Sequence, residues 1–153
     1  MRAVAQRVSQ ARVTVAGEEV GAIGTGLLVL VGMSEGDGER DLEWMARKIV
    51  GLRVFPDEDG RMNRSVADIG GAVLLVSQFT LCAEVEKGSR PSFVRAMEPE
   101  RAQAMFEQLV QRVGAKVPVA TGRFRAHMAV ELVNDGPVTL WLSSERGAGE
   151  RRS

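Results

Sequence analysis

Two side chains in this sequence have the chemistry of a nucleophile and its base. Cys82 is the only cysteine and His127 the only histidine among 153 residues, so any thiol- or imidazole-based site must use them. Cys82 directly follows an apolar stretch, where a lone cysteine is usually a small core residue. A period of two in residues 127–133 puts His127 on one strand face with Glu131, and this mixed face is not typical of a catalytic pocket. A thiol hydrolase is therefore the less favoured alternative.

Two polar segments are better candidates for a site. In SQFTL, residues 77–81, a buried strand changes abruptly to polar residues. In NDGPVTL, residues 134–140, Pro137 follows the turn pair Asp135-Gly136, although a returning hairpin strand would need a backbone donor there. Taken singly, the two segments are interpreted as a strand end and a turn. Together, in this order and at this separation, they form a motif that rarely arises by chance.

Metal and cofactor motifs are weak in this chain. No cluster of His, Cys, Asp or Glu has metal-ligand spacing, and we predict no metal and no cofactor. GAIGTG, residues 21–26, lacks the spacing of a dinucleotide fingerprint and is interpreted as a turn between strands. An enzyme with this equipment is limited to reactions that need positioning and oxyanion stabilisation, such as hydrolysis of an activated ester. One backbone donor can supply about 2.7–4 kcal/mol of that stabilisation.

Hydrophobic periodicity predicts many strands and two helices. Apolar spacing predicts a helix over residues 39–51, with Asp37 as its N-cap, and a second helix over residues 99–113. The eight or nine expected strands do not alternate regularly with helices. We therefore predict an α/β fold with three β/β/α layers: two largely antiparallel or mixed sheets packed together, with both helices on one face. Trp44 and Trp141 are interpreted as packing residues.

The length indicates one domain, and the charge balance indicates no strong overall electrostatic potential. Residues 1–143 are predicted to form a single domain and residues 144–153 a disordered tail. Twenty basic residues balance twenty acidic ones, but residues 87–125 carry a net charge of +5. This segment is either a solvated surface or a local phosphate-facing patch. The absence of a membrane-length apolar run and of a signal peptide predicts no membrane contact and a cytoplasmic location.

The motifs SQFTL and LVNDGPVTL, with MRAVAQRV, FPDEDGRMN and SRPSF, resemble those of bacterial D-aminoacyl-tRNA deacylases, formerly called D-tyrosyl-tRNA deacylases. The resemblance covers about residues 1–143. One departure is the stretch FRAHM, where the family often has a glycine and an acidic residue. No role is therefore carried onto Arg125 or His127.

The resemblance implies hydrolysis of the ester between a D-amino acid and the 3′-terminal adenosine of tRNA, and clearance of glycine mischarged on alanine tRNA. It also implies a homodimer with its sites at the subunit interface. The bond between Gly136 and Pro137 is expected to be cis. The motif Gly136, Pro137, Val138 and Thr139 then enters the other subunit's pocket, where backbone carbonyls fill the space that an L side chain needs.

Catalytic roles follow from the same resemblance. The backbone amides of Phe79 and Thr80 are expected near the developing oxyanion. No base accompanies Thr80 in the sequence, so we favour a positioning role for it, with help from the tRNA 2′-hydroxyl, over a role as nucleophile. Ser77 and Gln78 are expected to shape the adenosine pocket, and Arg7 to brace the Gly-Pro loop. The leading alternative is a non-catalytic nucleic-acid-binding dimer of the same fold.

Overall fold

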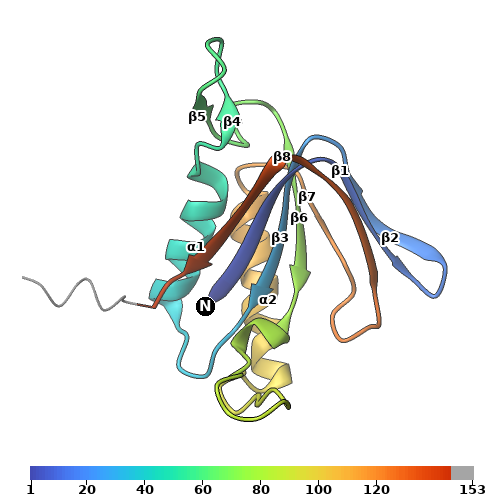
Figure 1. Ribbon diagram of the computed structural model, residues 1–153, viewed down its shortest axis with the longest axis vertical. Helices are drawn as coiled ribbons and strands as arrows, with labels where there is room; N and C mark the ends of the chain where they lie inside the picture. Colours follow the sequence, from blue (N-terminus) through green and yellow to red (C-terminus); the bar gives the residue numbers. More distant parts are fainter. Residues whose placement is uncertain (146–153) are drawn as a thin grey trace, which may run out of the picture.

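The computed structural model describes residues 1–145 as one large mixed sheet, one small sheet and two long helices (Figure 1). The elements are β1 (Arg2–Val15), β2 (Glu18–Ile23), β3 (Gly26–Gly32), α1 (Glu39–Gly51), β4 (Phe55–Pro56), β5 (Met62–Arg64), β6 (Ala72–Ser77), the 3₁₀ helix η1 (Phe79–Cys82), α2 (Pro99–Gly114), β7 (Val119–Thr121) and β8 (Ala129–Ser143).

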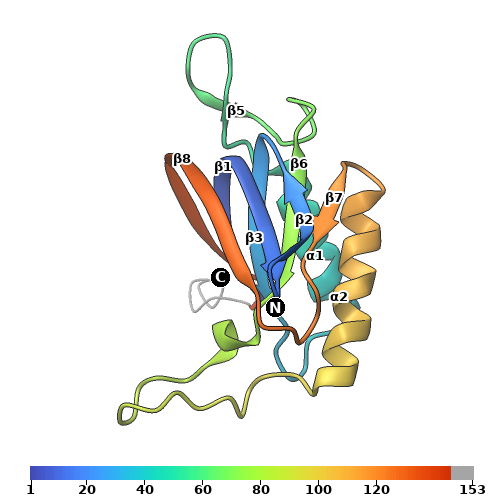
Figure 2. The same cartoon turned by 90° about the vertical axis from the view of Figure 1, so that its right-hand side faces the viewer.

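Strand β1 organises the large sheet because it is hydrogen-bonded along both edges. One edge pairs with β8 almost from end to end. The other edge pairs first with β3 and then, beyond Val8, with β2. All of these pairings are antiparallel, whereas β3–β6 and β6–β7 are parallel. Because β1 pairs with β3 in its first half and with β2 in its second half, it must bend. Its second half lies over the neighbouring strands (Figure 2).

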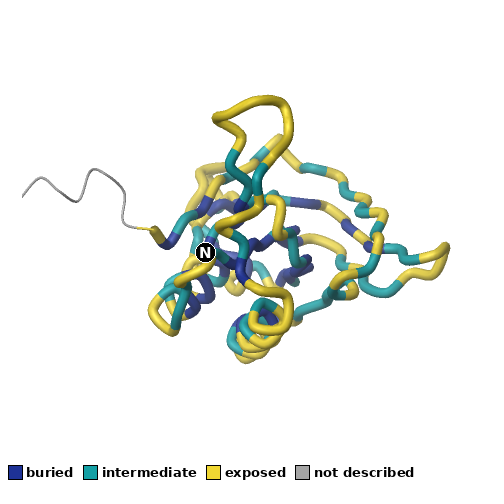
Figure 3. Tube along the Cα trace, turned by 90° about the horizontal axis from the view of Figure 1, so that it is seen from below, coloured by how far each residue is buried: buried dark blue, intermediate teal, exposed yellow. Residues whose placement is uncertain are grey.

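Two apolar cores separate the three layers. Alternate residues of β6 face opposite sides: Val73 and Leu75 join the core shared with the helices, whereas Leu74 and Val76 join a second core. The second core also contains Val13 of β1, with partly buried side chains of β2 and β8 packed against it. This division explains why β6 is apolar on both faces. It confirms the predicted α/β fold with β/β/α layers, in which both β layers are parts of the one six-stranded sheet. Figure 3 shows the buried segments inside the trace and the exposed ones around it.

Both helices lie on one side of the sheet, as predicted. Helix α1 buries four residues at helical spacing: Leu42, Met45, Ala46 and Ile49. Helix α2 begins with Pro99, which suits the first helical position, and buries Phe106, Leu109 and Val113. The prediction of Asp37 as the N-cap of α1 is wrong, because Gly38 occupies that position. The Asp37 carboxylate instead accepts hydrogen bonds from the Met1 ammonium group and from the Ser34 amide.

Three further expectations meet the structure here. GAIGTG does form the turn between β2 and β3, and Gly26 lies against the Ala72 carbonyl, where a side chain has no room. Trp141 is 57% exposed, so its interpretation as a packing residue is wrong for the single chain. Of the predicted tail, Ser144 is buried and residues 146–153 lie outside the described residues.

Residues 131–142 do not form the hairpin that their Asp-Gly pair suggests. Both flanks of that pair belong to β8 and pair with the same strand, β1. Gln6 opposes Thr139 and Val8 opposes Asn134, so four residues of β8 face the single residue Arg7. The chain therefore loops out and resumes the same ladder in the same direction. No helix among residues 1–145 is long and apolar enough to cross a membrane.

Candidate functional site

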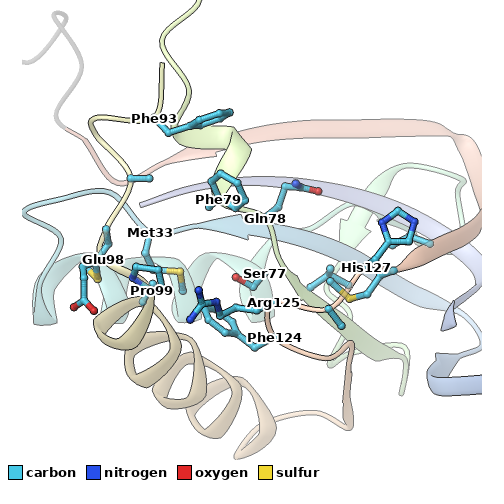
Figure 4. A pocket seen from close by; sticks show the side chains of 17 residues that line it. Met33, Ser77, Gln78, Phe79, Phe93, Glu98, Pro99, Phe124, Arg125 and His127 are labelled. Carbon is cyan, nitrogen blue, oxygen red and sulfur yellow. The ribbon is translucent and has the colours of Figure 1, made fainter. Parts of the chain in front are cut away.

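A cavity of about 630 Å³ opens where β6 ends (Figure 4). Its size falls within the range of small-molecule sites. Three predicted site residues, Ser77, Gln78 and Phe79, line it together. The remaining lining comes from the chain around Met33, from the segment leading into α2, and from residues 124–130 before and within β8. The cavity therefore collects segments that lie far apart in the sequence.

The end of β6 presents free backbone donors beside this cavity. The Gln78 amide still donates to the Val31 carbonyl at 2.7 Å, and the chain then turns into η1. The first amides of a helix have no partner within it. In the described part of the chain, the amides of Phe79 and Thr80 donate no hydrogen bond. Thr80 is not among the lining residues, and its hydroxyl oxygen accepts a 2.6 Å hydrogen bond from the Gln78 side chain.

An aromatic pair forms one wall of the cavity. The rings of Phe79 and Phe93 meet edge to face with their centroids 5.0 Å apart. Both remain accessible, with exposed fractions of 56% and 38%. Phe93 lies at the end of the loop that contains SRPSF, and the backbone bridge between Glu84 and Ser92 closes that loop. Exposed rings in a cavity wall are suited to packing against a planar group such as a nucleobase.

His127 lines the same cavity as Gln78 and Phe79 (Figure 4). The strand period of two expected at residue 127 does not extend to it, because residues 122–128 form a loop before β8 begins. Glu131, the acidic residue nearest to it in sequence on β8, accepts a hydrogen bond from Arg12 instead. That hydrogen bond, with the attraction of the guanidinium, holds the pKa of Glu131 below its usual range.

Cys82 does not belong to this site. Its side chain is fully buried, and its sulfur lies 3.3 Å from both the Met33 carbonyl oxygen and the Ser34 hydroxyl oxygen. It is not among the residues that line the cavity, which weakens the thiol-hydrolase alternative. Within residues 1–145, no three His, Cys, Asp or Glu side chains are grouped as metal ligands would be.

The loop around Gly136 and Pro137 does not line this cavity within one chain. The peptide bond between these two residues is cis. Arg7, the single residue opposite the loop, donates from Nε to the Asp135 carbonyl at 3.0 Å and from a terminal nitrogen to the Val54 carbonyl at 2.7 Å. The Asn134 side chain accepts from the Val138 amide at 3.0 Å. The loop is thus anchored at its base, while Gly136 and Pro137 are exposed.

The basic segment 87–125 is only partly available to a ligand. Three of its arginines form ion pairs with acidic residues outside the segment: Arg95 with Glu84, Arg101 with Glu35, and Arg112 with Glu39. Lys87 and Arg90 are exposed on the loop that leads to Phe93, and Arg125 lines the cavity. The positive charge near the site is therefore smaller and more local than the segment's net charge implies.

Several lining residues had no assigned role in the sequence. Phe124, Arg125 and His127 belong to the stretch FRAHM, onto which no role is carried, and Phe93 was noted only as part of a motif. Only the structure shows that Arg125 has a positive φ, in a turn position where glycine is usual. Met33 and Pro99 carry no such signal, because only the packing of β3 and α2 brings them to the end of β6.

Comparisons with known proteins give one consistent family. The family model described as D-Tyr-tRNA(Tyr) deacylase matches residues 4–143. A D-aminoacyl-tRNA deacylase from Desulfitobacterium hafniense is 58% identical over 95% of this chain and 99% of that protein. One from Chloroherpeton thalassium is 56% identical over 94% of this chain and 96% of that protein. The solved structure of a protein named c-Myc DNA Unwinding Element Binding Protein matches with a TM-score of 0.91 and 44% identity, covering 95% of this chain and all of that one.

Arg7→Ala should loosen the Gly-Pro loop and lower the free energy of unfolding by about 1–3 kcal/mol, because charged hydrogen bonds to two carbonyls are lost from a mostly buried side chain. Urea unfolding at one protein concentration measures this loss, and the Val138 amide should exchange faster with solvent. Arg12→Ala on the same strand is the matched control: it removes an exposed ion pair with Glu131 and should cost at most about 1 kcal/mol. Equal losses would contradict an anchoring role for Arg7.

Proposed function

The chain belongs to the D-Tyr-tRNA(Tyr) deacylase family, and from this we propose that it hydrolyses the ester that joins a D-amino acid to the 3′-terminal adenosine of tRNA. It is a hydrolase of carboxylic esters. One observation supports this reaction above the others: within residues 1–145 the backbone amides of Phe79 and Thr80 donate no hydrogen bond, and Phe79 lines a cavity together with Ser77 and Gln78. We further propose that the enzyme acts in the cytoplasm, where aminoacyl-tRNA is made.

The mechanism that we propose relies on backbone donors. Attack of water on the ester carbonyl creates an oxyanion, and the amides of Phe79 and Thr80 would donate hydrogen bonds to it. The bond to the ribose oxygen then breaks, which releases the amino acid and the tRNA. Thr80 positions the substrate and is held by Gln78 through the 2.6 Å hydrogen bond. The 2′-hydroxyl of the substrate itself assists, and Ser77 and Gln78 contact the adenosine.

Chirality is proposed to be set by the loop of Gly136, Pro137, Val138 and Thr139. Arg7 and Asn134 hold this loop by its base, so that its exposed backbone can serve as a rigid wall. A wall of backbone carbonyls rejects an L side chain by occupying its space, and it needs no side-chain recognition. Glycine has no side chain to reject, so glycine mischarged on alanine tRNA should also be cleared.

This arrangement requires a homodimer. The Gly136 loop does not line the cavity in one chain, so a second copy must bring it there. Strand β8 offers a surface for such a copy, because its outward positions carry exposed apolar side chains, with Val133 48% and Trp141 57% exposed. Large apolar side chains that stay exposed in the single chain can contribute to an interaction surface.

A second candidate is a non-catalytic nucleic-acid-binding dimer. It is favoured by the likeness to the structure named c-Myc DNA Unwinding Element Binding Protein. Both candidates require contact with a polynucleotide, so binding alone does not separate them. They differ in whether the bound ester is cleaved.

The purified protein should release D-tyrosine from D-tyrosyl-tRNA and glycine from alanine tRNA that is mischarged with glycine. L-Tyrosyl-tRNA should stay charged. Release of labelled amino acid under single-turnover conditions measures all three rates. Binding of each tRNA without release of any amino acid would favour the non-catalytic candidate.

Phe79→Pro should hydrolyse D-tyrosyl-tRNA about 10²–10³ times more slowly than Phe79→Ala, because proline lacks the amide that faces the oxyanion. Both variants lose the ring contact with Phe93, so their difference excludes the effect of losing that ring. Proline is tolerated at a first helical position, and Gln78 before it, with φ −142° and ψ 85°, lies outside the α region that a following proline disfavours. Thr80→Ala keeps its amide and should retain measurable hydrolysis. Equal rates for the two Phe79 variants, or a covalent aminoacyl adduct on Thr80, would overturn this mechanism.

Mixing Phe79→Pro with Gly136→Val should restore activity after subunit exchange. A side chain at Gly136 would crowd Val138 and Arg7 and would require a positive φ of 134°, so the loop is distorted. A symmetric heterodimer contains one site with both changes and one intact site. At equal amounts, about half of the dimers are heterodimers, so about a quarter of all sites are intact. The mixture should therefore recover about a quarter of the wild-type rate. A mixture that stays as slow as its two components would indicate sites within single chains.

A further inference from the structure

Arg125 occupies a backbone position that usually belongs to glycine. The Ala126 amide donates to the Arg123 carbonyl at 3.1 Å, which closes a four-residue turn with Arg125 at its third position. Arg125 has a φ of 65°, in the left-handed region where a side chain crowds the backbone. Turns with a positive φ at the third position favour glycine or asparagine. An arginine here carries a conformational cost that glycine would avoid.

The side chain of Arg125 is directed into the cavity. It is one of the lining residues, and Figure 4 shows its guanidinium group among the other lining side chains, between those of Pro99 and Ser77 in that view. No acidic residue among residues 1–145 forms an ion pair with it. Glu98 is the one acidic residue in the lining, and its carboxylate accepts from the Glu100 amide at the start of α2. A guanidinium in this setting is available to a ligand.

Strained backbone at a cavity is a reason to look for a function. The arginine side chain limits the class of ligand, because a guanidinium donates several hydrogen bonds in one plane and prefers an anion with two adjacent oxygens. The amino group of an aminoacyl ester is cationic, and the ester and the adenosine are neutral. The one anionic group attached directly to the terminal adenosine is the phosphate that links it to the preceding nucleotide.

We propose that Arg125 binds this phosphate and thereby positions the 3′ end of the tRNA in the cavity. The inference rests on the proposed function, since it takes the terminal adenosine as the occupant. Arg125 is a positioning residue: it holds the substrate by a group that does not react.

The test uses two small substrates that differ only by one phosphate: adenosine esterified at its 3′-oxygen with D-tyrosine, with and without a 5′-phosphate. Arg125→Gly should lower kcat/KM for the phosphorylated ester about tenfold, through KM, and leave the unphosphorylated ester within about twofold. With D-tyrosyl-tRNA, the slope of log kcat/KM against log salt should become shallower by about 0.7, as expected for one lost phosphate contact on a single strand. Arg47→Ala, which removes an exposed positive charge on α1 outside the cavity, should change neither quantity.

The outcomes separate this inference from the proposed function. If the wild-type protein hydrolyses neither small ester nor D-tyrosyl-tRNA, the proposed function fails. If it hydrolyses them and Arg125→Gly affects both small esters equally, or affects neither, the phosphate contact is wrong. Arg125→Gly should also unfold at an equal or higher urea concentration, because glycine accepts the positive φ. A lower midpoint would indicate that Arg125 serves the fold and would overturn the inference.

Discussion

The antiparallel ladder between β1 and β8 is the constraint on which the rest of the structure depends. Because β1 is paired along both edges, its bend brings β2 and part of β8 over the sheet and creates the second apolar core. The same ladder has one interruption, where four residues of β8 face Arg7. The pairing on both sides of this point fixes the ends of the loop. A Gly-Pro segment can therefore stand out from the sheet without loosening the strands that carry it.

The single chain separates two groups of residues that its proposed reaction needs together. The end of β6 supplies amide donors and a cavity, whereas the Gly136 loop lies on a part of β8 that does not reach that cavity. The proposed homodimer would resolve this separation, and the exposed Val133 and Trp141 of β8 would give the second copy apolar groups to contact. Under the proposed mechanism the loop would select by shape, so that one site could accept many D side chains and exclude L side chains.

The cavity contains little conventional catalytic equipment. Its thiol neighbour Cys82 is buried in contact with Met33 and Ser34, and Glu131 is engaged by Arg12. Beside the His127 imidazole, the described residues leave two amides without a hydrogen bond where a strand ends, two accessible rings, and an arginine held in a turn that favours glycine. Hydrolysis of an activated ester is within the reach of such a site, because oxyanion stabilisation by fixed donors needs no titrating group.

The sequence by itself determined the elements and their layers, because periods of 2 and 3.6 report which faces are buried. The stripe of α1 and the doubly apolar run of β6 are local patterns, and the structure has both. Motifs also brought Ser77, Gln78 and Phe79 forward as one group. Only the tertiary structure decided that residues 131–142 continue one strand, that His127 and Arg125 line the cavity, and that Trp141 is exposed. These outcomes depend on which strand lies opposite and on how loops distant in sequence meet, and local patterns carry no information about either.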